Sequence, residues 1–84
     1  MTNKVLVNVY VIKLDKIYDI YIPLDLPVGE IAGLICKAAN ILSENQLKSN
    51  NNYAIMDGSN GNFYDLNTIV GNTNIRNGKQ LIFF

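Results

Sequence analysis

Two features of this sequence have residue types that could bind a metal or attack a substrate. The run Asp57-x-Ser59-x-Gly61 is similar to the start of a calcium-binding loop, but its sixth position is not glycine and Thr68 stands where a bidentate glutamate is needed. Cys36 is the single cysteine, and the chain has no histidine to act as its base or to complete a zinc site. We therefore expect no metal site and a structural role for this thiol.

The carboxylates and glycines also lack a catalytic pattern. The seven carboxylates are scattered along the chain, and helical spacing brings none of them next to another, so no acid–base pair is indicated. No glycine-rich segment opens a helix with the Gly-Lys-Ser/Thr or Gly-x-Gly-x-x-Gly pattern that holds phosphates. The sequence predicts a protein that is not an enzyme and that uses no cofactor, metal or small-molecule substrate.

The composition indicates one small domain with a protein partner. The chain has 84 residues, 49% of them hydrophobic, and seven basic residues balance seven acidic ones. A net charge of zero lacks the positive surface that nucleic-acid binding needs. The longest helix-like apolar stretch, residues 31–36, is far shorter than the ~20 residues of a membrane-spanning helix, and no targeting signal is visible. We expect a single domain over residues 1–84, located in the cytoplasm, without direct membrane insertion.

The first half of the chain predicts two strands followed by a helix. Residues 5–13 alternate with a period of two, which places Val5, Val7, Val9 and Val11 on a buried face. Residues 17–22 alternate again after a short polar break, so a hairpin is expected. From residue 28 onward the apolar period changes to that of an amphipathic helix. The predicted apolar stripe of this helix comprises Val28, Ile31, Ala32, Ile35, Ala38, Ala39 and Leu42.

The second half predicts short strands joined by turns. A polar linker over residues 43–52 leads to strands at residues 53–56 and 63–64, separated by a turn rich in Asn and Gly. Residues 66–75 are expected to be turn-like or briefly helical, and Asn77-Gly78 marks a sharp turn into a last strand at residues 79–84. This order predicts an α+β domain with one helix packed across a mixed sheet of four to five strands. With the last strand parallel to the first, the arrangement is a β-grasp fold.

The sheet face that points away from the helix is the strongest candidate for a binding site. Because the strand period is two, the residues between the buried valines must point outward, and most of them are large and apolar. A contiguous apolar patch usually marks a binding site, unless the linker around Leu47 or residues 66–75 cover it. Tyr10 and Tyr21 are the expected anchors, because tyrosine combines a rigid ring with a polar tip. The predicted protein-interaction residues are Leu6, Tyr10, Ile12, Tyr21, Ile82 and Phe84.

Three segments of the sequence are similar to a known family. They are residues 18–28 (Tyr-Asp-Ile-Tyr-Ile-Pro-Leu-Asp-Leu-Pro-Val), the helix around Ile31 and Ile35, and the closing pattern Ile75-x-Asn77-Gly78-x-x-Leu81. Over nearly the whole chain they resemble the YukD/EsaB family, the small ubiquitin-like accessory proteins of type VII secretion systems in Gram-positive bacteria.

The resemblance implies a β-grasp fold, a cytoplasmic location and a non-enzymatic part in the assembly or regulation of the secretion machinery. It is also compatible with the ubiquitin-like domain at the cytosolic end of a larger secretion membrane protein. The asparagines at residues 50–52 depart from the expected pattern and leave the role of that loop open.

Two kinds of function remain open. Conjugation by a ubiquitin-like protein needs a flexible Gly-Gly tail, and the sequence instead ends in the strand-like run Leu81-Ile82-Phe83-Phe84, so we expect neither adenylation nor thioester formation. The first remaining function is an adaptor that docks a component of the secretion machinery through the outer sheet face. The second is a self-associating module that forms a homodimer through the same patch or through an unpaired edge strand.

Overall fold

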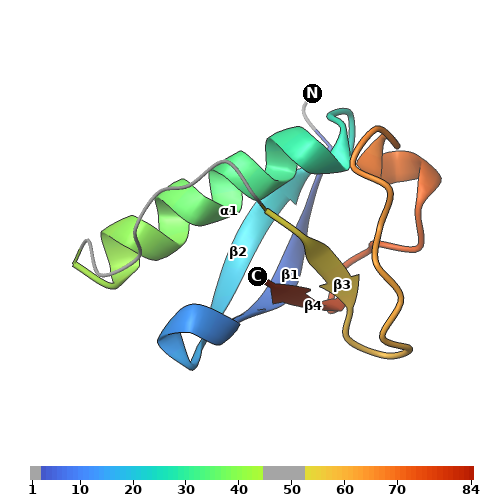
Figure 1. Cartoon of the computed structure of the whole chain (residues 1–84). Coiled ribbons are helices and arrows are strands. Elements are labelled where there is room, and N and C mark those ends of the chain that lie inside the picture. The colour runs from blue at the N-terminus through green and yellow to red at the C-terminus, as the bar shows by residue number, and fades with distance from the viewer. Residues whose placement is uncertain (1–2, 45–52) are drawn as a thin grey trace.

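The computed structural model describes residues 3–44 and 53–84, and Figure 1 shows one helix lying across a sheet. The four strands are ordered β2-β1-β4-β3, so the last strand lies in the middle of the sheet, next to the first. The elements are β1 (Lys4–Val11), β2 (Lys16–Pro23), α1 (Val28–Leu42), β3 (Ile55–Asp57) and β4 (Gln80–Phe83), with 3-10 helices η1 (Ile12–Leu14) and η2 (Val70–Asn72). The predicted β-grasp architecture is confirmed, with four strands.

β1 and β2 form the predicted hairpin, but the first strand is shorter than expected. The two strands pair antiparallel from Lys4, opposite Pro23, to Val11, opposite Lys16. The chain then turns through η1, which ends at Asp15 with a left-handed φ of 51° that aspartate tolerates better than most residues. The prediction that residues 12 and 13 continue the strand is wrong, because the chain already reverses there to bring Lys16 opposite Val11.

β4 completes the sheet parallel to β1, as predicted. Val9 lies opposite Leu81, and β3 pairs antiparallel on the other side of β4. Gly78 makes the preceding turn possible, because its φ of +84° is readily adopted only by glycine. The Gly78 N–H donates to the carbonyl oxygen of Leu6 at 2.8 Å, which ties the turn to β1.

The segment between β3 and η2 differs from the prediction. β3 begins at Ile55 instead of residue 53, and residues 63–64 do not form a strand. Phe63 makes one isolated bridge with Met56, and the Tyr64 N–H donates to the carbonyl oxygen of Ile55 at 2.9 Å. The turn over residues 57–64 therefore folds back against β3 and closes this edge of the sheet.

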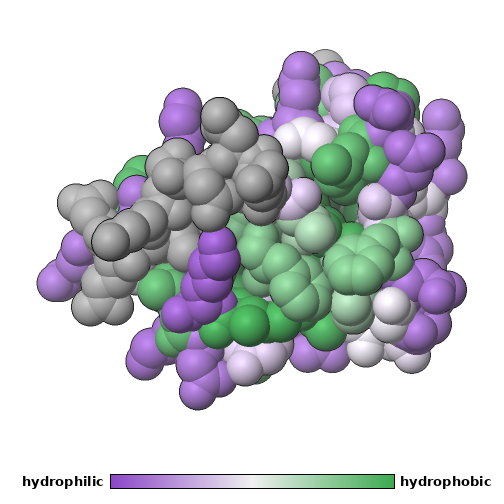
Figure 2. Space-filling model, in the orientation of Figure 1, coloured by the Kyte–Doolittle hydropathy of each residue, from purple (hydrophilic) through white to green (hydrophobic). Residues whose placement is uncertain are grey.

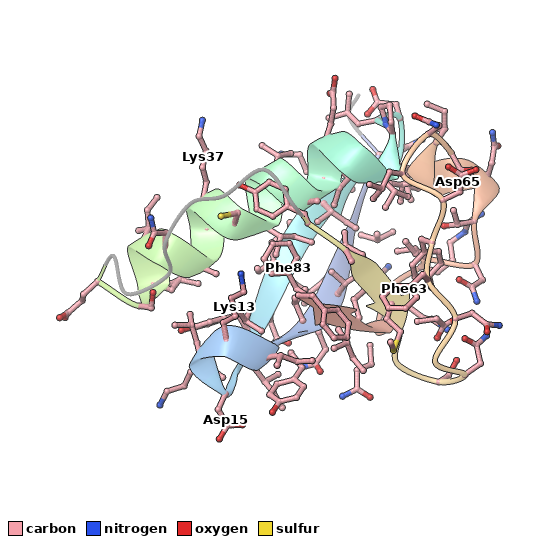
Figure 3. The ribbon with its side chains drawn as sticks, viewed as in Figure 1. Lys13, Asp15, Lys37, Phe63, Asp65 and Phe83 are labelled. Atoms are coloured by element: carbon pink, nitrogen blue, oxygen red, sulfur yellow. The ribbon has the colours of Figure 1, made fainter. Side chains whose placement is uncertain are left out.

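The core lies between the sheet and α1. The buried side chains of α1 face the alternate valines of β1, and Phe83 points from β4 toward the helix (Figure 3), where its ring stacks on that of Tyr53. Leu42 does not join the stripe and is 57% exposed; it lies beside Lys16 and Tyr18 of the edge strand β2. The buried residues of α1 are Val28, Ile31, Ala32, Ile35, Cys36 and Ala39.

Residues 66–75 pack against the start of α1. The helix has no side-chain cap, and its first N–H groups donate instead to backbone carbonyls of this segment, from Val28 to Thr68 at 2.9 Å and from Gly29 to Leu66 at 2.8 Å. These bonds place the segment beside the helix and not across the outer sheet face. Leu47, the other residue considered as a cover for that face, lies outside the described residues.

Candidate protein-interaction surface

The outer face of the sheet, opposite α1, carries a row of apolar side chains that crosses every strand. The strand register aligns these residues: Tyr10 lies opposite Ile17 on one side and Ile82 on the other, and Ile82 in turn lies opposite Met56, which bridges to Phe63. Residues directly opposite one another on one sheet face have their Cβ atoms about 5 Å apart, so their side chains are in contact. We call Ile17, Tyr10, Ile82, Met56 and Phe63 the apolar row.

The apolar row is exposed at both ends and packed in its middle. Ile17 is 57% exposed on β2, and Phe63 is 61% exposed beyond β3. The three central side chains are half-buried, since each has an apolar neighbour on both sides. Figure 2 shows hydrophobic residues gathered near β3 and β4, bordered by hydrophilic ones, and Figure 3 places Phe63 at that side of the molecule. A contiguous surface of this kind is typical of a binding site.

The structure divides the predicted site residues into three groups. Tyr10 and Ile82 belong to the apolar row, and the Phe84 ring packs against that of Phe63 with 5.6 Å between centroids. Leu6 and Tyr21 form a cross-strand pair on the same outer face, but they lie on the far side of a polar row made by Asn8, Asp19 and Gln80.

Ile12 is the exception, because it belongs to η1 and not to a strand. Its inclusion on the sheet face is corrected here: the strand alternation that placed it there ends at Val11. Ile12 is 41% exposed at the hairpin end of the molecule. That any of the predicted residues binds a partner stays a prediction.

Three residues of the apolar row were not among the predicted site residues. Ile17 has the outward parity of Asp19 and Tyr21 within the same strand, so alternation alone was sufficient to find it. Met56 and Phe63 needed the register between β3, β4 and the following turn, which no pattern in the sequence specifies.

Tyr10, near the hairpin end of the outer face, is anchored by a hydrogen bond. Its hydroxyl donates to Oδ1 of Asp15 at 2.7 Å, across the hairpin connection. This hydrogen bond, together with the negative charge of the carboxylate, raises the pKa of Tyr10 above its ordinary value. The ring therefore stays neutral at physiological pH and is fixed before any partner arrives, which suits an interface anchor.

The most strongly perturbed carboxylate, Asp57, is used for structure. It is buried, and its pKa is held well below the ordinary range by a 2.8 Å ion pair with Lys79 and by hydrogen bonds from Ser59 and Asn74. Tyr64 donates to Oδ1 of Asn74, and its own pKa is raised by burial and by the Asp57 charge. Both carboxylate oxygens of Asp57 are occupied by partners that connect β3 to the start of β4.

The other candidate groups do not converge on a site within residues 3–44 and 53–84. Across these residues no three cysteine or carboxylate side chains gather as metal ligands would. Cys36 is buried in the core, on the helix face toward the sheet. In the same part of the chain, no helix has both the length and the apolar character needed to span a bilayer.

Comparisons with known proteins show the fold without naming a family. No family model matches the sequence, and no curated protein matches it. Among solved structures, a protein described as "Molecular Mimicry of SUMO promotes DNA repair" aligns over all of this chain and 94% of its own, with a TM-score of 0.75 and 15% identity. The N-terminal ubiquitin-like domain of the 4931431F19Rik protein aligns over all of this chain and 76% of its own, with a TM-score of 0.75 and 12% identity.

A third solved structure belongs to a secretion assembly. A chain of the "MycP5-free ESX-5 inner membrane complex, State II" aligns with 96% of this chain at a TM-score of 0.77 and 16% identity. The alignment covers only 20% of that chain, so this chain is similar in fold to one part of a much longer one. At these identities the likeness establishes the ubiquitin-like β-grasp fold.

Proposed function

We propose that this chain is a non-enzymatic, ubiquitin-like adaptor or regulatory component of a type VII secretion system. It acts in the cytoplasm by docking a protein of the secretion machinery on the outer sheet face, and not by conjugation. The observation that carries this proposal is the apolar row, which crosses the whole sheet and which no described segment covers. The fold likeness to a chain of an ESX-5 complex supports the choice of machinery.

The chemistry of the outer face favours a protein partner. The apolar row supplies large side chains, and Tyr10 is fixed among them by its bond to Asp15. Such rigid aromatic and aliphatic anchors, surrounded by polar groups, carry most of the energy of protein interfaces. The most perturbed acidic group, Asp57, is occupied by Lys79 and Asn74 and does not belong to the apolar row.

Charge introduced into the apolar row tests the proposal. We expect the double substitution Tyr10→Lys and Ile82→Lys to weaken binding of the secretion-system membrane component at least ~100-fold, because two interface anchors would have to bury an ammonium group. The measurement is co-purification from the native cell, followed by titration of the purified component.

The matched control is Ile41→Lys, which places the same charge on α1 at a side chain that is 75% exposed. This variant should bind as the unmodified chain does. Both variants should still unfold cooperatively, although the double substitution should cost more free energy of unfolding than Ile41→Lys, because Tyr10 and Ile82 are half-buried. Binding that survives the double substitution would show that the apolar row is not the interface, and binding that is lost with Ile41→Lys would place the interface on the helix.

The small share of the ESX-5 chain that aligns with this sequence favours a variant of this proposal in which the sequence is a domain of a larger protein. That chain is about five times longer than the aligned domain, since only 20% of it is matched. The sequence would then be the cytosolic ubiquitin-like domain of a larger secretion membrane protein, which docks its partner through the same face. An immunoblot of the native cell with an antibody against residues of α1 separates the two, because the free adaptor migrates near 9.4 kDa and the domain with a far larger chain.

The open edge of β2 favours self-association as a second candidate function. In β1, the backbone groups of Leu6 and the N–H of Asn8 form hydrogen bonds with β4 and with the turn before it. The backbone groups of the odd-numbered residues of β1 therefore form the hydrogen bonds to β2. Ile17, Asp19 and Tyr21 consequently direct their backbone groups outward, where a second copy could add a strand. Sedimentation over a wide concentration range tests this, and a monomer at every concentration excludes it.

A further inference from the structure

The outer face contains a hollow of about 400 Å³ on the far side of the polar row from the apolar row. It lies between β1, β2 and the turn before β4. Two bonds hold this turn against β1: the Leu6 N–H donates to Oδ1 of Asn77, and the Gly78 N–H donates to the Leu6 carbonyl, both at 2.8 Å. A Cβ at Gly78 would meet no heavy atom of the described residues within 4 Å, so the space beside this turn is open.

The walls of the hollow differ in chemistry. Leu6 gives an apolar floor, and the Tyr21 ring, which is 67% exposed, stands on the β2 side. The carboxylate of Asp19 lies at the end nearest the apolar row, where the Asn8 amide donates to its Oδ1 at a long 3.3 Å. Among the described residues, no basic side chain forms an ion pair with Asp19.

Lys4 lies at the opposite end of the hollow. It stands two pairing rows from Asp19, or roughly 13 Å along the strand at ~3.3 Å per residue. The Asp19 end is therefore negative, exposed and beside an aromatic ring. A carboxylate beside an aromatic ring is complementary to a side chain that has a cationic group at the end of an apolar stem.

We propose that the hollow binds an arginine side chain of the docked protein. The planar guanidinium group of the arginine would donate two hydrogen bonds to the Asp19 carboxylate, and its face would stack on the Tyr21 ring. The methylene groups of the same side chain would cover Leu6. The apolar row begins one pairing row further along, at roughly 7 Å, so one short segment with an arginine next to apolar residues reaches both. This inference rests on the proposed docking function and adds what the partner must present.

Amide chemical shifts of the isotope-labelled chain test the site directly. The probe is Nα-acetyl-arginine methylamide, and its neutral isostere, the citrulline derivative, is the comparison. We expect saturable shifts at Leu6, Asn8, Asp19, Tyr21 and Gly78 with the arginine probe, and an affinity for the citrulline probe lower by up to about fivefold, the effect of one exposed ion pair.

Two neutralising substitutions complete the test. Asp19→Asn keeps the shape of the side chain and the contact from Asn8. It should lower the affinity for the arginine probe to that for the citrulline probe. Asp25→Asn, which neutralises an exposed carboxylate on the loop between β2 and α1, should leave the affinity unchanged.

Three results would contradict the arginine site. They are equal affinity for the two probes, no saturable shift up to the solubility limit, and undiminished binding of the arginine probe by the Asp19→Asn variant. The docking proposal has a separate readout, because it is tested by whether the Tyr10→Lys and Ile82→Lys variant still binds the secretion component and does not involve the arginine probe. A chain that binds that component through the apolar row but ignores the arginine probe would keep the proposed function and lose this inference.

Discussion

At the scale of single residues, the ionised Asp57 makes the fold depend on pH. Its folded-state pKa is lowered, chiefly by Lys79, so its contribution to stability is complete above the unfolded pKa of about 4 and is lost as the pH falls below it. We expect Asp57→Asn to be less stable than the unmodified chain at neutral pH, with a difference that shrinks as the pH is lowered from about 5. Denaturant midpoints measured across this range give the difference directly.

The control for this effect is Asp25→Asn, since Asp25 is exposed. Its midpoint should follow that of the unmodified chain at every pH. A difference between the Asp57→Asn variant and the unmodified chain that stays constant down to strongly acid pH would show that the ion pair with Lys79 does not lower the pKa of Asp57.

At the scale of elements, two glycines should respond in opposite ways to alanine. A Cβ at Gly33, on the exposed side of α1, meets no heavy atom within 4 Å, so Gly33→Ala should stabilise the protein by about 0.5–1 kcal/mol through helix propensity. A Cβ at Gly58 falls 2.8 Å from the backbone carbonyl oxygen of Gln80, so Gly58→Ala must push β3 and β4 apart and destabilise it. Thermal unfolding midpoints should move up for the first variant and down for the second.

The elements themselves were largely predictable from local patterns. The alternation of Val5 to Val11 and the helical period from Val28 each fix which side chains are buried, because one face of each element must enter the core. Leu42 is an exception, because at the last turn of α1, beside the edge strand β2, its side chain is 57% exposed within the described part of the chain. Ile12 does not follow the strand alternation, because the hairpin turn has already begun at this residue.

The candidate site was only half predictable, for a physical reason. Parity within one strand tells which side chains point outward, and it identified Tyr10, Tyr21 and Ile82. Which of them are neighbours depends on the register between strands, and this register separates Leu6 and Tyr21 from the apolar row and brings Met56 into it. Register is set by turns and long-range contacts, which sequence periodicity does not contain.

At the scale of the whole molecule, packing leaves few surfaces free for recognition. α1 covers the inner sheet face, and the turn over residues 57–64 closes the β3 edge. Among the surfaces of the sheet itself, the outer face and the β2 edge remain in the described part of the chain. The same fold occurs in the structure described as "Molecular Mimicry of SUMO promotes DNA repair" and in a chain of an ESX-5 complex, so the fold by itself does not choose the partner. The side chains on the outer face must make that choice.

The most direct test is site-specific photo-cross-linking in the native cell. A benzophenone derivative of phenylalanine at position 63, close in shape to the exposed side chain it replaces, reports on the end of the apolar row, and the same group at position 41 reports on the helix. We predict a cross-link from position 63 to a membrane component of the type VII secretion system, identified by mass spectrometry, and none from position 41. A cross-link to that component from position 41 alone, or from neither position, would contradict docking through the outer face.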